Sequence, residues 1–295
     1  MLTRLGHLLP PLICGLGGLL FVTGRVGGED RQTEKPESEQ RLPAWVEPMR
    51  RVHARFKGQP KTLAHFGDSI TVTMAYWAPL EHLGKDVPKE MQRPLATVQD
   101  YMAPQCWRTW KGPEYGSDGG QTIRWAHENI GGWLDKLRPE AAVIMFGTND
   151  LGGIELEEYD AKTRQVVSAC LERGTVPILS TIPPRHGFDE KAAVFAAAVR
   201  AIADDMHVPL IDYQAEVLAR RPDDWDGQLE KFNRYEGYEV PTLIARDGVH
   251  PSYPEKHQHD FSEESLRSSG YTLRSYLTLL KYAEVINLAL KPNGD

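Results

Sequence analysis

The strongest constraint on the fold of this chain is a repeated alternation of short apolar runs with longer stretches of helical periodicity. The apolar runs, each too short for a helix, are residues 62–66, 141–146, 176–181 and 208–211. The helical stretches are residues 44–56, 121–137, 156–171, 192–206 and 271–290. Continuously apolar strands separated by amphipathic helices are typical of a parallel sheet that is covered on both faces. The sequence therefore predicts an α/β fold, a three-layer αβα sandwich with a mainly parallel, flavodoxin-like sheet.

Composition narrows the class of protein further. The chain has 295 residues, which is long enough for a substantial core. The sequence has no repeat and no extreme Gly or Pro content, which excludes a fibrous or wholly disordered protein. The 34 basic and 41 acidic residues give a net charge of −7. We expect no nucleic-acid partner, because phosphate binding requires clustered Lys and Arg.

The first residues indicate export. Arg4 precedes an apolar run that extends to Thr23, and a polar segment follows Gly24. This pattern predicts a signal peptide over residues 1–24, with an uncleaved membrane anchor as the alternative. Residues 25–42 are mostly polar and predict a disordered linker, so the folded domain spans 43–295. We expect a secreted or periplasmic protein whose mature domain does not insert into a membrane.

Two cysteines, Cys106 and Cys170, remain after removal of the predicted signal peptide. An oxidising compartment permits a disulfide between them. We nevertheless expect two separate buried thiols, and keep the disulfide as the alternative.

Polar side chains follow the predicted strands, at the edge of a parallel sheet where ligands bind. Ser69 follows the first strand, Asn149 follows the second, and Asp247 and His250 stand three residues apart late in the chain. Each has a structural alternative: a helix N-cap for Ser69, and turns for the others. Together they predict chemistry, because a hydroxyl needs a nearby base, and an imidazole needs a carboxylate to orient it. Asn149 would donate a hydrogen bond to a developing oxyanion.

These residues lie in motifs that resemble the SGNH, or GDSL-type, hydrolase family from about residue 62 to 290. The matching blocks are Gly67-Asp68-Ser69, Gly120 before a helix, Gly147-Thr148-Asn149-Asp150 and Asp247-Gly248-Val249-His250-Pro251. The resemblance implies a catalytic triad of Ser69, His250 and Asp247. It also implies an oxyanion hole made by Ser69, Gly120 and Asn149, with Gly119 as the alternative to Gly120. Such a serine hydrolase requires no metal or other cofactor.

The chain departs from the family pattern in two places. Gly270-Tyr271 follows the His block about fifteen residues later than is usual for the family, after an inserted segment. The first crossover, from residue 74 to 117, is also long. Both segments are expected to lie at the rim of the site, so they bear on substrate choice and not on the catalytic residues.

Aromatic residues in the long crossover bear on the substrate. Trp77, Trp107 and Trp110 lie between the predicted nucleophile and the oxyanion glycine, where they would stack on sugar rings; core packing is the alternative. His186, after the third strand, is a further candidate for substrate contact, with an exposed turn as its alternative. We therefore expect a secreted esterase acting on an O-acyl or O-acetyl group of a small-molecule or polysaccharide ester. A carbohydrate O-acyltransferase and a non-enzymatic binding module are the alternatives.

Overall fold

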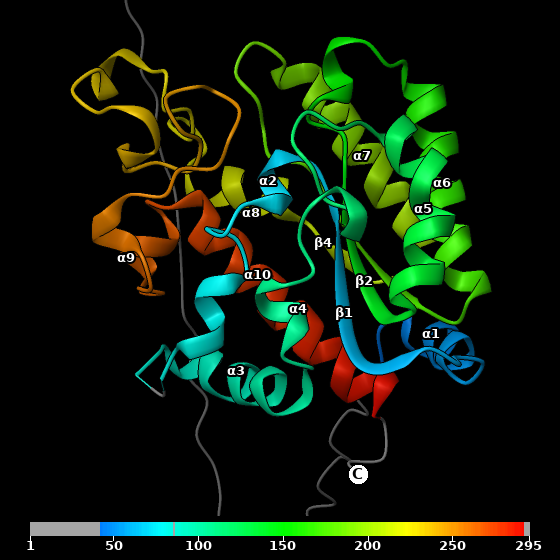
Figure 1. The fold of residues 1–295 in the computed structure, drawn as a ribbon. Helices are drawn as coiled ribbons and strands as arrows, with labels where there is room; N and C mark the ends of the chain where they lie inside the picture. Colours follow the sequence, from blue (N-terminus) through cyan, green and yellow to red (C-terminus); the bar gives the residue numbers. More distant parts are fainter. Residues whose placement is uncertain (1–41, 85, 292–295) are drawn as a thin grey trace, which may run out of the picture. The chain divides into compact units, whose positions relative to one another are not determined.

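The computed structural model describes residues 42–84 and 86–291 of the chain. The predicted signal peptide, and all of the predicted linker except Leu42, lie outside the described residues. The folded part is a sheet with helices on both faces (Figure 1).

The sheet has four parallel strands in the order β1-β2-β3-β4. They are β1 (Gln59–Gly67), β2 (Pro139–Met145), β3 (Val176–Ser180) and β4 (Leu210–Ile211). All residues of β2 and β3 are buried, as continuous apolar runs predict. Gly67 pairs with Met145, so the carboxyl ends of β1 and β2 meet at one edge. The predicted strands and the parallel sheet are confirmed.

Two helical layers cover the sheet. On one face, α5 (Ile123–Leu137), α6 (Leu156–Glu172) and α7 (Asp189–Asp205) pack in sequence order (Figure 1). The other layer contains α1 (Val46–His53), α3 (Lys89–Tyr101), α4 (Gln105–Arg108) and α10 (Gly270–Val285), which continues as a π-helix over Ile286–Leu290. The predicted three-layer arrangement is confirmed.

The edge beyond β1 differs from a complete flavodoxin-like sheet. At the place of a fifth strand, Ser117 forms only a single parallel bridge with Gly67. The Gly67 N–H donates to the Gly116 carbonyl at 3.0 Å, and the Asp118 N–H donates to the Gly67 carbonyl at 3.2 Å. Gly116 has φ +89°, and a Cβ there would lie 2.3 Å from Phe66. The crossover loop therefore lies against β1 at the topological switch point, where α/β sheets bind ligands.

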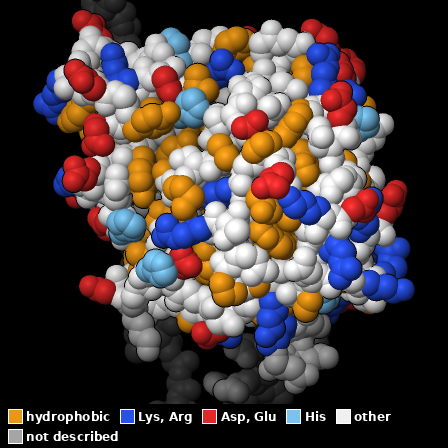
Figure 2. All heavy atoms as spheres, in the orientation of Figure 1, with side chains coloured by type: hydrophobic (Ala, Val, Ile, Leu, Met, Phe, Trp, Pro, Cys, Tyr) orange, Lys and Arg blue, Asp and Glu red, His pale blue; other side chains and the backbone are white. Residues whose placement is uncertain are grey.

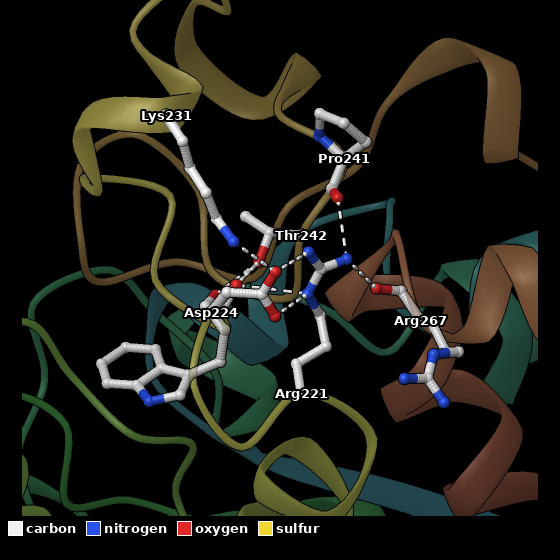
Figure 3. Close-up of polar contacts among 7 residues, drawn as sticks. Arg221, Asp224, Lys231, Pro241, Thr242 and Arg267 are labelled. Carbon is white, nitrogen blue, oxygen red and sulfur yellow. Dashed lines mark hydrogen bonds and ion pairs between the residues drawn. The ribbon is translucent and has the colours of Figure 1, made fainter.

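Residues 221–268 form a largely irregular segment between α8 (Tyr213–Arg220) and α10 that includes the short α9 (Glu263–Leu266). Arg221 donates two hydrogen bonds to the Asp224 carboxylate and one each to the carbonyls of Asp224, Pro241 and Arg267 (Figure 3). Lys231 binds the same Asp224 carboxylate at 2.7 Å. These bonds join the beginning, middle and end of the segment, which therefore has a fixed shape despite its few regular elements.

Cys106 and Cys170 are buried free thiols, as expected. Burial raises the pKa of each thiol to about 12. Across the part of the chain that the structure describes, every helix is too short or too polar to cross a bilayer. Figure 2 shows acidic and basic side chains interspersed over the viewed face.

Candidate active site

Ser69 stands where β1 meets a short helix. Asp68 is the N-cap of α2 (Ser69–Val72), and its Oδ1 accepts a hydrogen bond from the Ile70 N–H at 3.0 Å. A Cβ on Gly67 would lie 2.1 Å from Thr71 Oγ1 and 2.8 Å from the Met145 carbonyl oxygen, so this tight junction requires glycine. Ser69 is the first residue of α2 and is half-buried at the carboxyl edge of the sheet.

The imidazole beside Ser69 is oriented by a short turn. Asp247 Oδ1 accepts hydrogen bonds from the N–H groups of Val249 and His250, both at 2.9 Å. Its Oδ2 lies 2.7 Å from His250 Nδ1. Burial alone would raise the pKa of Asp247, but the His250 hydrogen bond and the two backbone donors outweigh it and lower the pKa. The Asp247 carboxylate is therefore ionised and accepts a hydrogen bond from His250 Nδ1, which carries the proton.

That tautomer leaves His250 Nε2 free to accept a proton. It lies 2.9 Å from Ser69 Oγ, across 181 residues of sequence. The structure thus brings the three predicted residues Ser69, His250 and Asp247 into one hydrogen-bonded line. A hydroxyl in this arrangement can lose its proton to the imidazole as it attacks a carbonyl carbon.

The predicted oxyanion donors come from the start of α2, from the loop before α5 and from the loop after β2. Asn149 Nδ2 donates to the Gln121 carbonyl at 2.9 Å and lies 3.5 Å from Asp68 Oδ2. The Gly119 N–H is engaged by Asp118 Oδ1 at 2.9 Å. The N–H groups of Ser69 and Gly120 form no hydrogen bond with any described residue. The loop before α5 is thereby held beside Asn149, with donors left for a ligand.

Two buried carboxyl groups support these loops. Asp150 Oδ1 accepts the Ile123 N–H at 2.9 Å and joins the loop after β2 to the start of α5. Burial raises the pKa of Asp68 to about 6 and that of Asp150 to about 7, and the charge of Asp68 adds to the rise at Asp150. Both groups are therefore protonated more readily than ordinary aspartates.

A buried arginine and a half-buried lysine hold the far end of α2. Arg274, from α10, donates to the Ile70 carbonyl at 2.6 Å and to Thr71 Oγ1 at 3.0 Å. Lys111 Nζ donates to the carbonyls of Thr71 and Thr73 at 3.1 and 2.8 Å. Burial and the nearby Arg274 lower the Lys111 pKa to about 7. This support was not predicted from the sequence, although an arginine within an apolar helix was a possible signal for it.

The three tryptophans expected at the rim lie in the core instead. Trp77 is completely buried and stacks on Trp107 at a centroid distance of 5.2 Å, while Trp110 is only 8% exposed. The backbone N–H of Trp77 also donates to Ser275 Oγ of α10 at 3.1 Å, because the long crossover packs against that helix. Their rings have no free face for a sugar, so the prediction of a substrate rim from these residues is wrong.

His186 lies against the turn that carries Asp247 and His250, and its contact with substrate stays a prediction. Its N–H donates to the Gly248 carbonyl at 2.9 Å, and its Nδ1 lies 2.6 Å from Asp226 Oδ2. Tyr238, which was not predicted from the sequence, is an exposed residue whose ring centroid is 5.9 Å from that of His250. An isolated tyrosine in an irregular segment gives no periodicity or motif that would have identified it.

The displaced Gly270-Tyr271 pair returns to the triad. The N–H groups of Gly270 and Tyr271 donate to Ser252 Oγ and to the Ser252 carbonyl, both at 3.1 Å. Ser252 is only two residues after His250, so the inserted residues loop outward without separating α10 from the site. Among the described residues, no three His, Cys, Asp or Glu side chains are grouped to hold a metal ion.

Comparisons with known proteins found solved structures that are similar to this chain. The solved lipase/acylhydrolase from Enterococcus faecalis is similar at 15% identity and a TM-score of 0.50, over 76% of this chain and 96% of its own. Esterase EstA from Pseudoalteromonas sp. is similar at 14% identity and a TM-score of 0.48, over 77% of this chain and 99% of its own. The acetylxylan esterase Axe2 from Geobacillus stearothermophilus is similar at 18% identity and a TM-score of 0.46, over 78% of this chain and 95% of its own.

No curated protein matches the sequence. The model of the GDSL-like Lipase/Acylhydrolase family matches residues 65–253, which include Ser69, Asn149, Asp247 and His250. This match covers most of the folded part of the chain. The chain therefore belongs to the GDSL-like lipase/acylhydrolase family and is a carboxylic ester hydrolase.

Proposed function

We propose that this chain is an exported serine esterase that removes O-acyl groups, in particular O-acetyl groups, from carbohydrates. Ser69 is the nucleophile, His250 the general base and Asp247 the residue that orients it. The observation that carries the assignment is the pair of hydrogen bonds of His250, 2.9 Å to Ser69 Oγ and 2.7 Å to Asp247 Oδ2. Export rests on the signal-peptide pattern of residues 1–24.

In the first step, Ser69 Oγ attacks the ester carbonyl and its proton passes to His250 Nε2. The negative charge that develops on the carbonyl oxygen accepts hydrogen bonds from the Ser69 and Gly120 N–H groups and from Asn149 Nδ2. Asn149 suits this role because Nδ2 carries two hydrogens: one binds the Gln121 carbonyl at 2.9 Å, and the other has only a long 3.5 Å contact with Asp68 Oδ2, which the oxyanion would replace. Gly120 suits it better than Gly119, whose N–H already binds Asp118.

In the second step, His250 gives its proton to the leaving alcohol, which departs and leaves an acyl group on Ser69. Water then takes the place of the alcohol, His250 removes a proton from it, and the acid is released. An acceptor hydroxyl in place of water would make the chain an acyltransferase, with no change in the residues involved. Family membership as an ester hydrolase excludes the non-enzymatic alternative.

Hydrolysis of 4-nitrophenyl acetate and butyrate tests the assignment. Ser69→Ala is expected to lower kcat by at least about 10³-fold, because the nucleophile is lost. Ser168→Ala, in α6, is the matched control and is expected to retain full activity. A Ser69→Ala protein as active as the control would refute the triad. Addition of a sugar acceptor distinguishes transfer from hydrolysis by the formation of acylated sugar.

The acyl-carbohydrate part of the proposal has its own test. Mature protein incubated with acetylated xylan and other acetylated polysaccharides is expected to release acetate. Hydrolysis of short-chain nitrophenyl esters without release of acetate from any carbohydrate would retain the esterase and discard the carbohydrate substrate.

A further inference from the structure

A second imidazole–carboxylate pair lies directly against the Asp247–His250 turn and takes no part in the triad. His186 Nδ1 is 2.6 Å from Asp226 Oδ2, and the His186 N–H donates to the Gly248 carbonyl at 2.9 Å. Gly248 has φ +71°, and a Cβ there would lie 2.5 Å from His186 Cβ and 2.7 Å from Gln228 Nε2. The side chains of His186 and Gln228 thus contact the residue between Asp247 and His250.

The position of Asp226 determines which ring nitrogen of His186 is available. The Asp226 side chain is 11% exposed, and its Oδ1 accepts the Gln228 N–H at 2.8 Å. An ionised carboxylate only accepts hydrogen bonds, so His186 Nδ1 donates to it. In the neutral ring, Nε2 is then an acceptor for a hydroxyl proton, and in the protonated ring it donates to a hydroxyl oxygen.

His186 Nε2 is free to meet such a group. The side chain is 49% exposed, and no described residue forms a hydrogen bond with Nε2. Since Asp226 and the Gly248 carbonyl fix the residue at two points, little side-chain freedom is lost when a ligand binds. An oriented, partly exposed imidazole of this kind is suited to bind a hydroxyl group.

An apolar surface lies next to the same turn. Tyr238 is 43% exposed, and its ring centroid is 5.9 Å from that of His250. The backbone is fixed there, because the Tyr253 N–H donates to the Tyr238 carbonyl at 2.9 Å. An exposed aromatic ring gives a flat apolar surface of the kind on which the C–H face of a sugar ring packs.

We propose that His186, oriented by Asp226, binds a free hydroxyl on the alcohol part of the ester while Tyr238 supports its ring. The subsite fits a partly acylated saccharide, in which a hydroxyl lies on a carbon next to the esterified one. This assignment rests on the proposed function, because the bound alcohol is the one that Ser69 releases. Tyr238 and His186 take the place of the tryptophans that the sequence suggested.

The test compares two esters that differ only in their hydroxyls: a mono-O-acetylated methyl xylopyranoside, and the same acetate with its other hydroxyls methylated. The measured quantity is the ratio of kcat/KM for the first ester to that for the second. His186→Ala is expected to lower this ratio about three- to tenfold, the value of one hydrogen bond. Asp226→Asn is expected to lower it in the same direction, and the double variant no further than His186→Ala alone.

His82→Ala is the matched control, because His82 is an exposed imidazole 3.3 Å from Glu81 in the 3₁₀ turn Ala78–His82. It is expected to leave the ratio unchanged. His186→Asn and thermal unfolding of every variant separate a binding effect from misfolding, because a misfolded protein loses activity on both esters equally. A monoacylglycerol and its methyl ether form a second substrate pair that distinguishes a saccharide from a lipid alcohol.

An unchanged ratio in folded His186→Ala and His186→Asn would overturn the subsite. A ratio that falls only for the monoacylglycerol pair would overturn the saccharide assignment. The esterase itself is judged separately by Ser69→Ala on 4-nitrophenyl acetate, which carries no such hydroxyl. The subsite can therefore fail while the triad stands.

Discussion

Replacement of Asp150 by asparagine should stabilise the protein, and should do so more at high pH than at low pH. Asp150 is completely buried, its Oδ1 accepts the Ile123 N–H, and its Oδ2 has no hydrogen-bond partner among the described residues. Burial raises its pKa from 3.8 to about 7. An asparagine keeps the acceptor at Oδ1 and removes the charge that burial disfavours.

The sign and size of the pH dependence of the free energy of unfolding follow from proton linkage. Below pH 3.8 the group is protonated in both the folded and the unfolded chain, and its folded-state stabilisation is fully present. As the pH rises toward about 7, the unfolded chain loses the proton first, and about 1.4 kcal/mol of stability is lost per pH unit. The loss is complete above the folded-state pKa and amounts to about 4 kcal/mol.

Urea denaturation at pH 5 and pH 8 measures this effect. The free energy of unfolding of Asp150→Asn minus that of the parent should increase by about 3 kcal/mol between the two pH values. Asp204→Asn, at an exposed site on α7, is the control and should show no such increase. A difference between Asp150→Asn and the parent that does not vary with pH would refute the reasoning.

Three further predictions concern the site and the core. Asn149→Ala should lower kcat by about 10²–10³-fold with a small change in KM, because an oxyanion donor acts mainly in the transition state. Steady-state kinetics on 4-nitrophenyl acetate measure this, and a rise in KM with kcat unchanged would contradict it. Arg274→Met should lower kcat and destabilise the protein by about 1–3 kcal/mol, because the Ile70 carbonyl loses its donor. Urea denaturation and measurement of kcat test this, and full activity would show that the support of α2 by Arg274 is dispensable. Cys106 and Cys170 should resist iodoacetamide at pH 8 in the native protein and react after denaturation; mass spectrometry measures this, and native labelling of either would contradict their burial.

Much of the fold was predictable because most of its sheet is buried. Strands such as residues 141–146 are apolar throughout, and neighbouring helices repeat at helical spacing, so the pattern identifies both layers. The contacts between Ser69, His250 and Asp247 were predictable from motifs, since a carboxylate three residues before a histidine can turn back onto its ring. Such local geometry depends little on the rest of the chain.

The substrate side was not predictable in the same way. Trp77 and Trp107 were expected at the rim, but packing against α10 and its neighbours placed them in the core. The partner of His186 is Asp226, 40 residues away within an irregular segment, and no periodicity links the two. Arg274 supports α2 across 204 residues of sequence. These contacts depend on the path of long loops, which local sequence patterns do not determine.

Covalent trapping of the nucleophile tests the central claim most directly. The parent protein is treated with a 4-nitrophenyl phosphonate ester, which transfers its phosphonyl group to an activated serine, and the digested protein is examined by mass spectrometry. We predict one phosphonyl group on the peptide that contains Ser69, loss of esterase activity in proportion to labelling, and no labelling in His250→Ala. Labelling of another residue, or full esterase activity in a protein labelled at Ser69, would contradict the assignment.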